Sequence, residues 1–149
     1  MSNMELPEAT VESLTISGNL KVVKDGEGRL SGVTGIGSST FPGVLEVNAG
    51  TVYVATDFKL GTTADGTLTI SGGTVEVNNS KATHIGASNG KTGTVNLNGG
   101  ILKTKRLVNL TGATGMINFD GGTLQANNTD NNGLFGNKVT VTVNAGGGT

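Results

Sequence analysis

The sequence predicts an all-β fold, a right-handed, single-stranded parallel β-helix in which a three-sided coil is stacked about six times. Three observations lead to it. Glycine contributes 26 of the 149 residues, which indicates many tight turns. Val, Ile and Thr are abundant and favour strands. A short motif also recurs along the chain, and such repeats are typical of solenoids.

The repeat consists of a strand, a small-residue corner and a second strand. Its clearest copies are GTLTISGGTVEV from Gly66, GTVNLNGGILKT from Gly93 and GMINFDGGTLQA from Gly115. Including one looser and two degenerate copies, the repeat begins at residues 12, 43, 66, 93, 115 and 139. Apolar residues alternate at a period of two, which indicates strands and not helices. The unequal steps predict loops of variable length on a constant frame.

Stacking the copies predicts buried columns of apolar side chains. Before the corner, these columns contain Leu14, Leu45, Leu68, Val95, Ile117 and Val141, and Ile16, Val47, Ile70, Leu97, Phe119 and Val143. After the corner follow Val52, Val75, Leu102 and Leu124, and a third strand is indicated by Ile36, Leu60, Ile85, Leu110 and Phe135. Three strands in about 22–24 residues predict a three-sided coil. No coil can bury its apolar face without its neighbours.

The corner also repeats. Short polar residues occupy its first position, namely Ser17, Asn48, Ser71, Asn98, Asp120 and Asn144. The second position holds Gly18, Ala49, Gly72, Gly99, Gly121 and Ala145. We interpret both sets as structural, since short polar side chains bond local backbone and only small residues fit between stacked turns. A left-handed backbone is expected at Gly99.

Residues 1–11 are predicted to be an N-terminal cap or tail, and residues 12–149 the coils of the β-helix. Pro7, Glu5 and Glu8 in the first segment discourage strand addition. After the last predicted strand the chain continues only as Asn-Ala-Gly-Gly-Gly-Thr149. We therefore expect an open edge at the last coil, with either end-to-end self-association through it or fraying of the residues beyond about 138.

The run from Gly66 to Asn128, with its three GG-centred copies, resembles the autotransporter-associated β-strand repeats of bacterial passenger domains. The resemblance extends over residues 43–149 and weakly over 12–42. It implies a secreted or surface-displayed β-helix, extracellular or on the bacterial cell surface, often part of an adhesin. The sequence shows neither the signal sequence nor the translocation domain of that family, so we expect a segment of a longer solenoid.

No catalytic, cofactor-binding or metal-ligating residue is predicted. The acids Glu46 and Glu76 lie on different strands, so no acid/base pair is expected in adjacent coils. An alternative pair made by loops would be Asp57 with Asp25. His84 is the only histidine, is expected to be exposed, and lacks the companions of a zinc site. The acids of Asp120-Gly-Gly and Asp130-Asn-Asn are too isolated for a calcium cage.

Charge and composition limit the partners. The net charge is −1 and aromatic residues make up 3% of the chain, which disfavours nucleic acid. No apolar run is long enough to insert into a membrane. Lys103, Lys105 and Arg106 could bind a polyanion, although pairing of Lys103 with Glu76 is the simpler expectation. The outward residues Thr51, Thr74 and Thr123 are interrupted by Ile101, which disfavours an ice-binding face.

The favoured function is a non-catalytic, structural or adhesive β-helix segment that binds a host-surface or polysaccharide receptor. One alternative is a carbohydrate-binding or carbohydrate-processing β-helix similar to the pectate-lyase type. Another is a trimeric segment of a phage tail fibre or spike.

Overall fold

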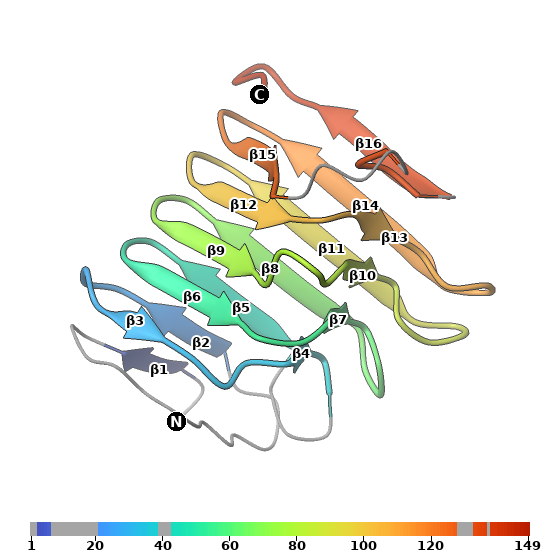
Figure 1. Cartoon of the computed structure of the whole chain (residues 1–149), viewed down its shortest axis with the longest axis horizontal. Coiled ribbons are helices and arrows are strands. Elements are labelled where there is room, and N and C mark those ends of the chain that lie inside the picture. Colours follow the sequence, from blue (N-terminus) through green and yellow to red (C-terminus); the bar gives the residue numbers. More distant parts are fainter. Residues whose placement is uncertain (1–2, 7–20, 39–42, 128–132, 137) are drawn as a thin grey trace.

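The computed structural model describes residues 3–6, 21–38, 43–127, 133–136 and 138–149. Within these residues the chain forms strands and turns, and every pair of neighbouring strands is parallel. Successive coils lie side by side from the N-terminal to the C-terminal end of the stack (Figure 1). The predicted three-sided parallel β-helix is therefore confirmed, with about five turns in place of the expected six.

The strands of the described residues belong to three sheets. Sheet A contains β1 (Asn3–Leu6), β2 (Lys21–Lys24), β5 (Val44–Val47), β8 (Gly66–Ile70), β11 (Thr92–Leu97), β14 (Thr114–Phe119) and β16 (Val139–Val143). Sheet B contains β3 (Arg29–Leu30), β6 (Thr51–Val54), β9 (Thr74–Val77), β12 (Ile101–Thr104) and β15 (Thr123–Ala126). Sheet C contains β4 (Gly35–Ile36), β7 (Phe58–Leu60), β10 (Thr83–Ile85) and β13 (Leu107–Val108).

The core is built from columns of inward-pointing side chains. Leu45, Leu68, Val95 and Ile117 lie opposite one another in sheet A and are fully buried. The columns of Val47, Ile70, Leu97 and Phe119 and of Val52, Val75, Leu102 and Leu124 are buried as well. Burying a Leu or Val side chain contributes about 1.5–3 kcal/mol. The period-two pattern thus specifies the register between coils, because a slip of one residue would expose the apolar set.

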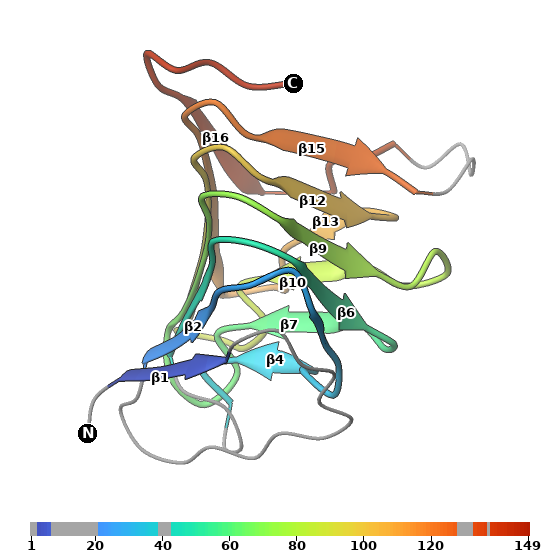
Figure 2. The ribbon, with the colours of Figure 1, turned by 90° about the vertical axis from the view of Figure 1, so that its left-hand side faces the viewer.

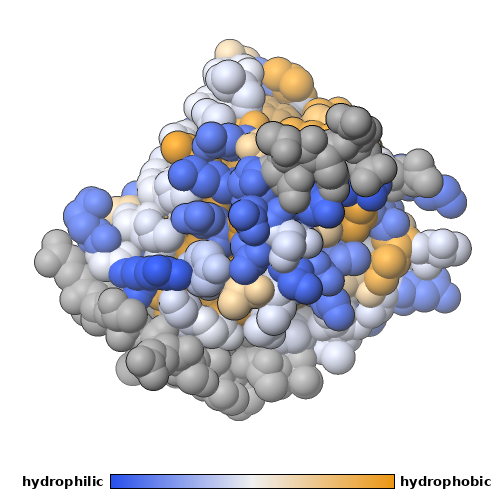
Figure 3. All heavy atoms as spheres, in the orientation of Figure 1, coloured by the Kyte–Doolittle hydropathy of each residue, from blue (hydrophilic) through white to orange (hydrophobic). Residues whose placement is uncertain are grey.

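The last coil departs from this pattern. Val141 pairs with Ile117 and Val143 with Phe119, as predicted. However, no further strand of sheet A follows β16 in the described part of the chain, so Val141 is 45% and Val143 64% exposed. Apolar atoms are visible at this end of the stack (Figure 3). The C-terminal coil therefore presents core positions to solvent.

The C-terminal tail covers part of this end. The Leu124 amide donates to the Thr149 carbonyl at 2.7 Å, and the Thr149 amide donates to the Gly122 carbonyl at 3.1 Å. The tail crosses the end of the stack beside β15 (Figure 2). A Cβ at Gly148 would lie 2.7 Å from the Phe119 Cβ, so the tail approaches this aromatic residue closely. The glycine-rich C-terminal tail therefore covers more of the last turn of sheet B than the sequence suggested.

The prediction for the first coil is wrong in register. The strand that pairs with β5 is β2, so Val22 lies opposite Leu45 where Leu14 was expected. Lys24 lies opposite Val47 where Ile16 was expected. Residues 12–18, the predicted first copy, lie outside the described residues. Within the predicted cap or tail, β1 pairs with β2 as the terminal strand of sheet A.

Lys24 is fully buried at this inward-facing position. Its ammonium donates to the carbonyl oxygens of Asp25, at 2.8 Å, and Gly26, at 2.7 Å. A buried ammonium needs such partners, because an unpaired polar group in the core is costly. The Lys24 side chain folds back and binds backbone carbonyl groups of the corner that follows β2. A pattern of apolar and polar residues in the sequence does not reveal this contact.

The third strand also needs a correction. Thr83 pairs with Leu107 and His84 with Val108, which places Asn109 and not Leu110 beside Ile85. Leu110 is 43% exposed. Phe135 bridges to Leu107 and so belongs to the column of Phe58 and Thr83. The Leu-x-Gly spacing in this coil misplaced the inward residue by one position.

Corner glycines act through two different constraints. Gly50 and Gly73 both have φ of 68°, a left-handed conformation that favours glycine. Gly99 was expected to share it, but its φ is not positive. A Cβ at Gly99 would instead lie 2.7 Å from the Ser71 carbonyl oxygen of the preceding coil. Close stacking, and not backbone handedness, requires glycine there.

The described residues contain no helix that is long and apolar enough to cross a membrane.

Candidate functional site: a polar pocket on sheet C

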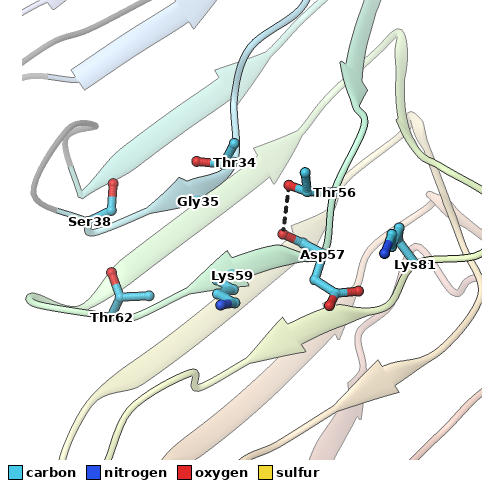
Figure 4. Close-up of a pocket in the computed structure, with 8 residues that line it drawn as sticks. All are labelled: Thr34, Gly35, Ser38, Thr56, Asp57, Lys59, Thr62 and Lys81. Atoms are coloured by element: carbon cyan, nitrogen blue, oxygen red, sulfur yellow. Dashed lines mark hydrogen bonds between the residues drawn. The ribbon is translucent and has the colours of Figure 1, made fainter.

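A polar pocket of about 270 Å³ lies on the outer face of sheet C. Its walls come from three successive coils, and they are made of Thr34, Gly35, Ser38, Thr56, Asp57, Lys59, Thr62 and Lys81. Asp57 and Lys81 lie at one end, and Ser38 and Thr62 lie toward the other (Figure 4). The lining thus combines hydroxyl groups with two ammonium groups and one carboxylate.

The strand alternation of β7 positions the central lysine. Phe58 and Leu60 are buried in the core, which turns Lys59 outward. Gly35 is its partner in the preceding coil and also faces outward. A Cβ at Gly35 would lie 2.7 Å from the Lys59 carbonyl oxygen, so this position suits only glycine. Glycine there lets the backbones of β4 and β7 pack closely under the pocket.

Backbone contacts hold several lining groups in place. The Ala82 amide donates to Oδ1 of Asp57 at 3.0 Å, which leaves Oδ2 on the other side of the carboxylate. The Thr62 hydroxyl donates to the Gly37 carbonyl at 3.1 Å, and the Thr56 hydroxyl to the Asp57 carbonyl at 3.3 Å. Each of these hydroxyls keeps lone pairs that can accept a hydrogen bond.

His84 pairs with the pocket residue Lys59, which lies in the preceding coil. It points away from the core as predicted, but its side chain is only 20% exposed, so the expected exposed histidine is wrong. Burial lowers the pKa of His84, Asp57 opposes this shift, and Lys59 adds to it. Nε2 lies 4.0 Å from Oδ2 of Asp57, and Nδ1 is buried with no hydrogen-bond partner among the described residues. Burial therefore favours the neutral form of the imidazole.

The aspartates near the turns link consecutive coils. Asp57 accepts from the Ala82 amide, Asp65 from the Thr92 amide at 2.8 Å and Asp120 from the Gly146 amide at 2.8 Å. Each acceptor and donor are 25–27 residues apart, which is one coil. These carboxylates therefore stabilise the stack, since charged acceptors make strong bonds to backbone amides.

Outward polar residues of sheet A are also bonded from coil to coil. The side-chain amide of Asn118 donates from Nδ2 to Oδ1 of Asn96 at 2.8 Å. The side-chain amide of Asn96 donates from Nδ2 to the Thr69 hydroxyl at 3.3 Å. Thr69 lies between Glu46 and Asn96, as predicted. Glu46 forms a 2.9 Å ion pair with Lys21, so this acid also serves a contact between coils.

On sheet B the predicted register holds. Lys103 lies opposite Glu76, and Ile101 separates the threonine column. The expected Glu76–Lys103 ion pair is not among the salt bridges of the described residues. A different charged contact is present on this sheet, where the Arg29 guanidinium lies over the Tyr53 ring, 4.2 Å from its centre. The described residues contain no group of three or more His, Cys, Asp or Glu side chains arranged to hold a metal ion.

The sequence did not reveal the pocket. It placed Asp57 in a loop and considered a pair with Asp25, whereas Asp57 lies on the pocket with Lys59 and Lys81. The sequence does contain a signal for an outward polar surface here, because Lys59 stands between the inward residues Phe58 and Leu60, and threonines lie on either side. Predicting the pocket also requires the register of the third strand in three coils. That register cannot be derived from the sequence, because the loops differ in length.

Comparisons with protein-family models, curated proteins and solved structures returned no match for this chain.

Proposed function

We propose that this chain is a structural and adhesive β-helix segment of a bacterial secreted or surface-displayed protein, resembling the autotransporter passenger type, and that it is non-catalytic. The observation that carries the proposal is the use of outward carboxylates as bonds between coils. Asp57, Asp65 and Asp120 each accept a backbone amide from the next coil. Because these carboxylates bind backbone amides between coils, they favour a structural role for the chain over acid/base catalysis.

The open C-terminal coil supports a role in end-on assembly. Sheet A has β1 at one edge and β16 at the other, and all its strands are parallel. Two copies related by a translation along the stack would therefore bring β1 of one copy beside β16 of the other. Such a head-to-tail contact pairs unsatisfied strand edges and covers Val141 and Val143. A second copy of this chain is the occupant that continues the sheet in register.

Sedimentation velocity over a range of protein concentrations tests the assembly. We expect reversible growth of a linear series of oligomers, which Val143→Glu abolishes because a charge cannot enter the buried contact. Thr142→Glu is the matched control, since Thr142 lies on the same strand and faces outward. A concentration-independent monomer would contradict end-on association, and a discrete trimer would favour a fibre or spike.

A depolymerisation assay tests the non-catalytic part. The chain is incubated with polygalacturonate and other bacterial and plant polysaccharides, with and without calcium. We expect no unsaturated or reducing-end products. Product formation that is lost on Asp57→Asn would overturn the proposal in favour of a carbohydrate-processing β-helix.

A further inference from the structure

We propose that the pocket on sheet C binds one acidic sugar unit of an oligosaccharide. The proposal rests on the adhesive function above and gives it a ligand class. It starts from the charges of the lining. Lys59 and Lys81 contribute two positive charges and Asp57 one negative charge, so the pocket is positive on balance although the whole chain has a net charge of −1. An anionic group is therefore favoured at this site.

The hydroxyl groups indicate what surrounds the anion. Thr34, Thr56 and Thr62 line the same space as the lysines. A sugar ring presents several hydroxyl groups that both donate and accept, which matches threonine hydroxyls and the free side of the Asp57 carboxylate. Oδ1 of Asp57 already accepts the Ala82 amide, and a ligand with only acceptor oxygens would offer no donor to Oδ2. The lining thus fits a ligand that carries hydroxyl donors beside its acidic group.

Size separates a sugar from a small ion. The pocket measures about 270 Å³, and liquid water occupies about 30 Å³ per molecule. A sulfate or phosphate ion would leave most of this space to water, whereas a pyranose ring with a carboxylate fills it. The pocket is slightly smaller than the usual range for ligand sites, which begins at about 300 Å³. One sugar unit is therefore bound at a time, with the rest of the oligosaccharide outside.

The binding geometry follows from the lining. The carboxylate or sulfate of the sugar lies beside the ammonium group of Lys59, because the Asp57 carboxylate lies between Lys59 and Lys81 (Figure 4). The ring hydroxyls face Thr34, Thr56 and Asp57. None of the described residues that line the pocket is aromatic, so these residues hold the ring by hydrogen bonds and charge. Affinity should consequently be modest for one site and fall with added salt.

The test is a titration of the full chain, followed by amide chemical shifts and calorimetry. The probes are trigalacturonate, a sulfated galactose trisaccharide, the neutral galactose trisaccharide and inorganic sulfate. We expect saturable binding of at least one acidic trisaccharide, with shifts at Thr34, Lys59 and Lys81. The two acidic probes distinguish a carboxylate from a sulfate as the recognised group. Binding to the neutral trisaccharide and to inorganic sulfate should be at least tenfold weaker.

Variants assign the binding to this pocket. Lys59→Met should weaken acidic trisaccharide binding at least tenfold, because it removes the positive charge at the centre of the pocket. Lys59 is exposed, so the substitution should leave the fold intact. Lys103→Met is the matched control on sheet B and should change binding less than twofold. Asp57→Asn should tighten binding of the acidic trisaccharide, since it removes a repelling charge. Its amide oxygen can still accept the Ala82 amide, and its NH2 group can donate to a sugar hydroxyl where Oδ2 accepted from one. These opposite effects separate a local loss of charge from a folding defect.

Several outcomes would overturn the proposal. Equal binding of the neutral trisaccharide would show that the lysines recognise no charge. Equal binding of inorganic sulfate would reduce the pocket to a simple anion site. Absence of binding, or binding unaffected by Lys59→Met, would also reject it. Each of these leaves the proposed structural role standing, whereas cleavage of trigalacturonate would reject that role itself.

Discussion

The hydroxyl of Thr83 donates a 2.9 Å hydrogen bond to the hydroxyl of Thr104 inside the largely apolar core. Both residues are fully buried. The bond joins sheet C to sheet B, and Thr104 donates onward to the Arg106 carbonyl at 3.2 Å. Thr104 stands where the preceding coils have Val54 and Val77, which pair with each other. This polar chain fixes the turn between β12 and β13.

Substitutions of this pair should be strongly non-additive. Thr104→Val leaves the Thr83 hydroxyl buried without its acceptor, and should lower the free energy of unfolding by about 1–3 kcal/mol. The double change Thr83→Val with Thr104→Val removes both groups and should cost less than the single change at Thr104. Urea unfolding of the single and double variants gives the coupling energy. Additive effects would show that the two hydroxyls do not interact.

The buried columns make a second prediction. Leu68→Ala should lower the free energy of unfolding by about 3–5 kcal/mol, because Leu68 is fully buried between Leu45 and Val95 and leaves a cavity. Val143→Ala, at the open coil, should cost less than about 1 kcal/mol in dilute solution. Thermal and urea unfolding measure both. Comparable losses would mean that the last coil is as well packed as the centre of the stack.

A third prediction separates the two constraints on glycine. Gly73 and Gly90 have similar φ values of 68° and 71°, so alanine at either position carries left-handed strain of about 1–2 kcal/mol. A Cβ at Gly73 also meets the Gly50 carbonyl oxygen at 2.6 Å, whereas nothing lies within 4 Å of one at Gly90. Gly73→Ala should therefore be clearly more destabilising than Gly90→Ala. Equal shifts in melting temperature would remove the stacking constraint from the corner.

A fourth prediction concerns pH. Burial lowers the pKa of His84 below its ordinary value of 6.5, so the fold favours the neutral imidazole. Its contribution to stability is then fully present above pH 6.5 and is lost as the pH falls through the lowered pKa of the folded chain. As the pH falls from 7.5 to 5, the wild type should lose more unfolding free energy than the His84→Gln variant. A difference that stays constant over this range would contradict it.

The sequence by itself determined the repeating part of the molecule. Alternation in the copies at residues 43, 66, 93, 115 and 139 was enough to predict parallel strands, their register in sheets A and B, and the inward columns. The physical reason is that a period of two permits one register that buries every apolar side chain. Five consecutive copies reinforce the same choice.

Only the tertiary structure decided the rest. Lys24 enters an apolar column because its ammonium reaches two backbone carbonyls of the corner, a contact that depends on how the chain turns. The third strands are short and follow loops of unequal length, so their register is set by pairing with the neighbouring coil. The sheet C pocket combines side chains of three coils for the same reason. Local patterning specifies a strand, but a surface site depends on which coils the stack brings together.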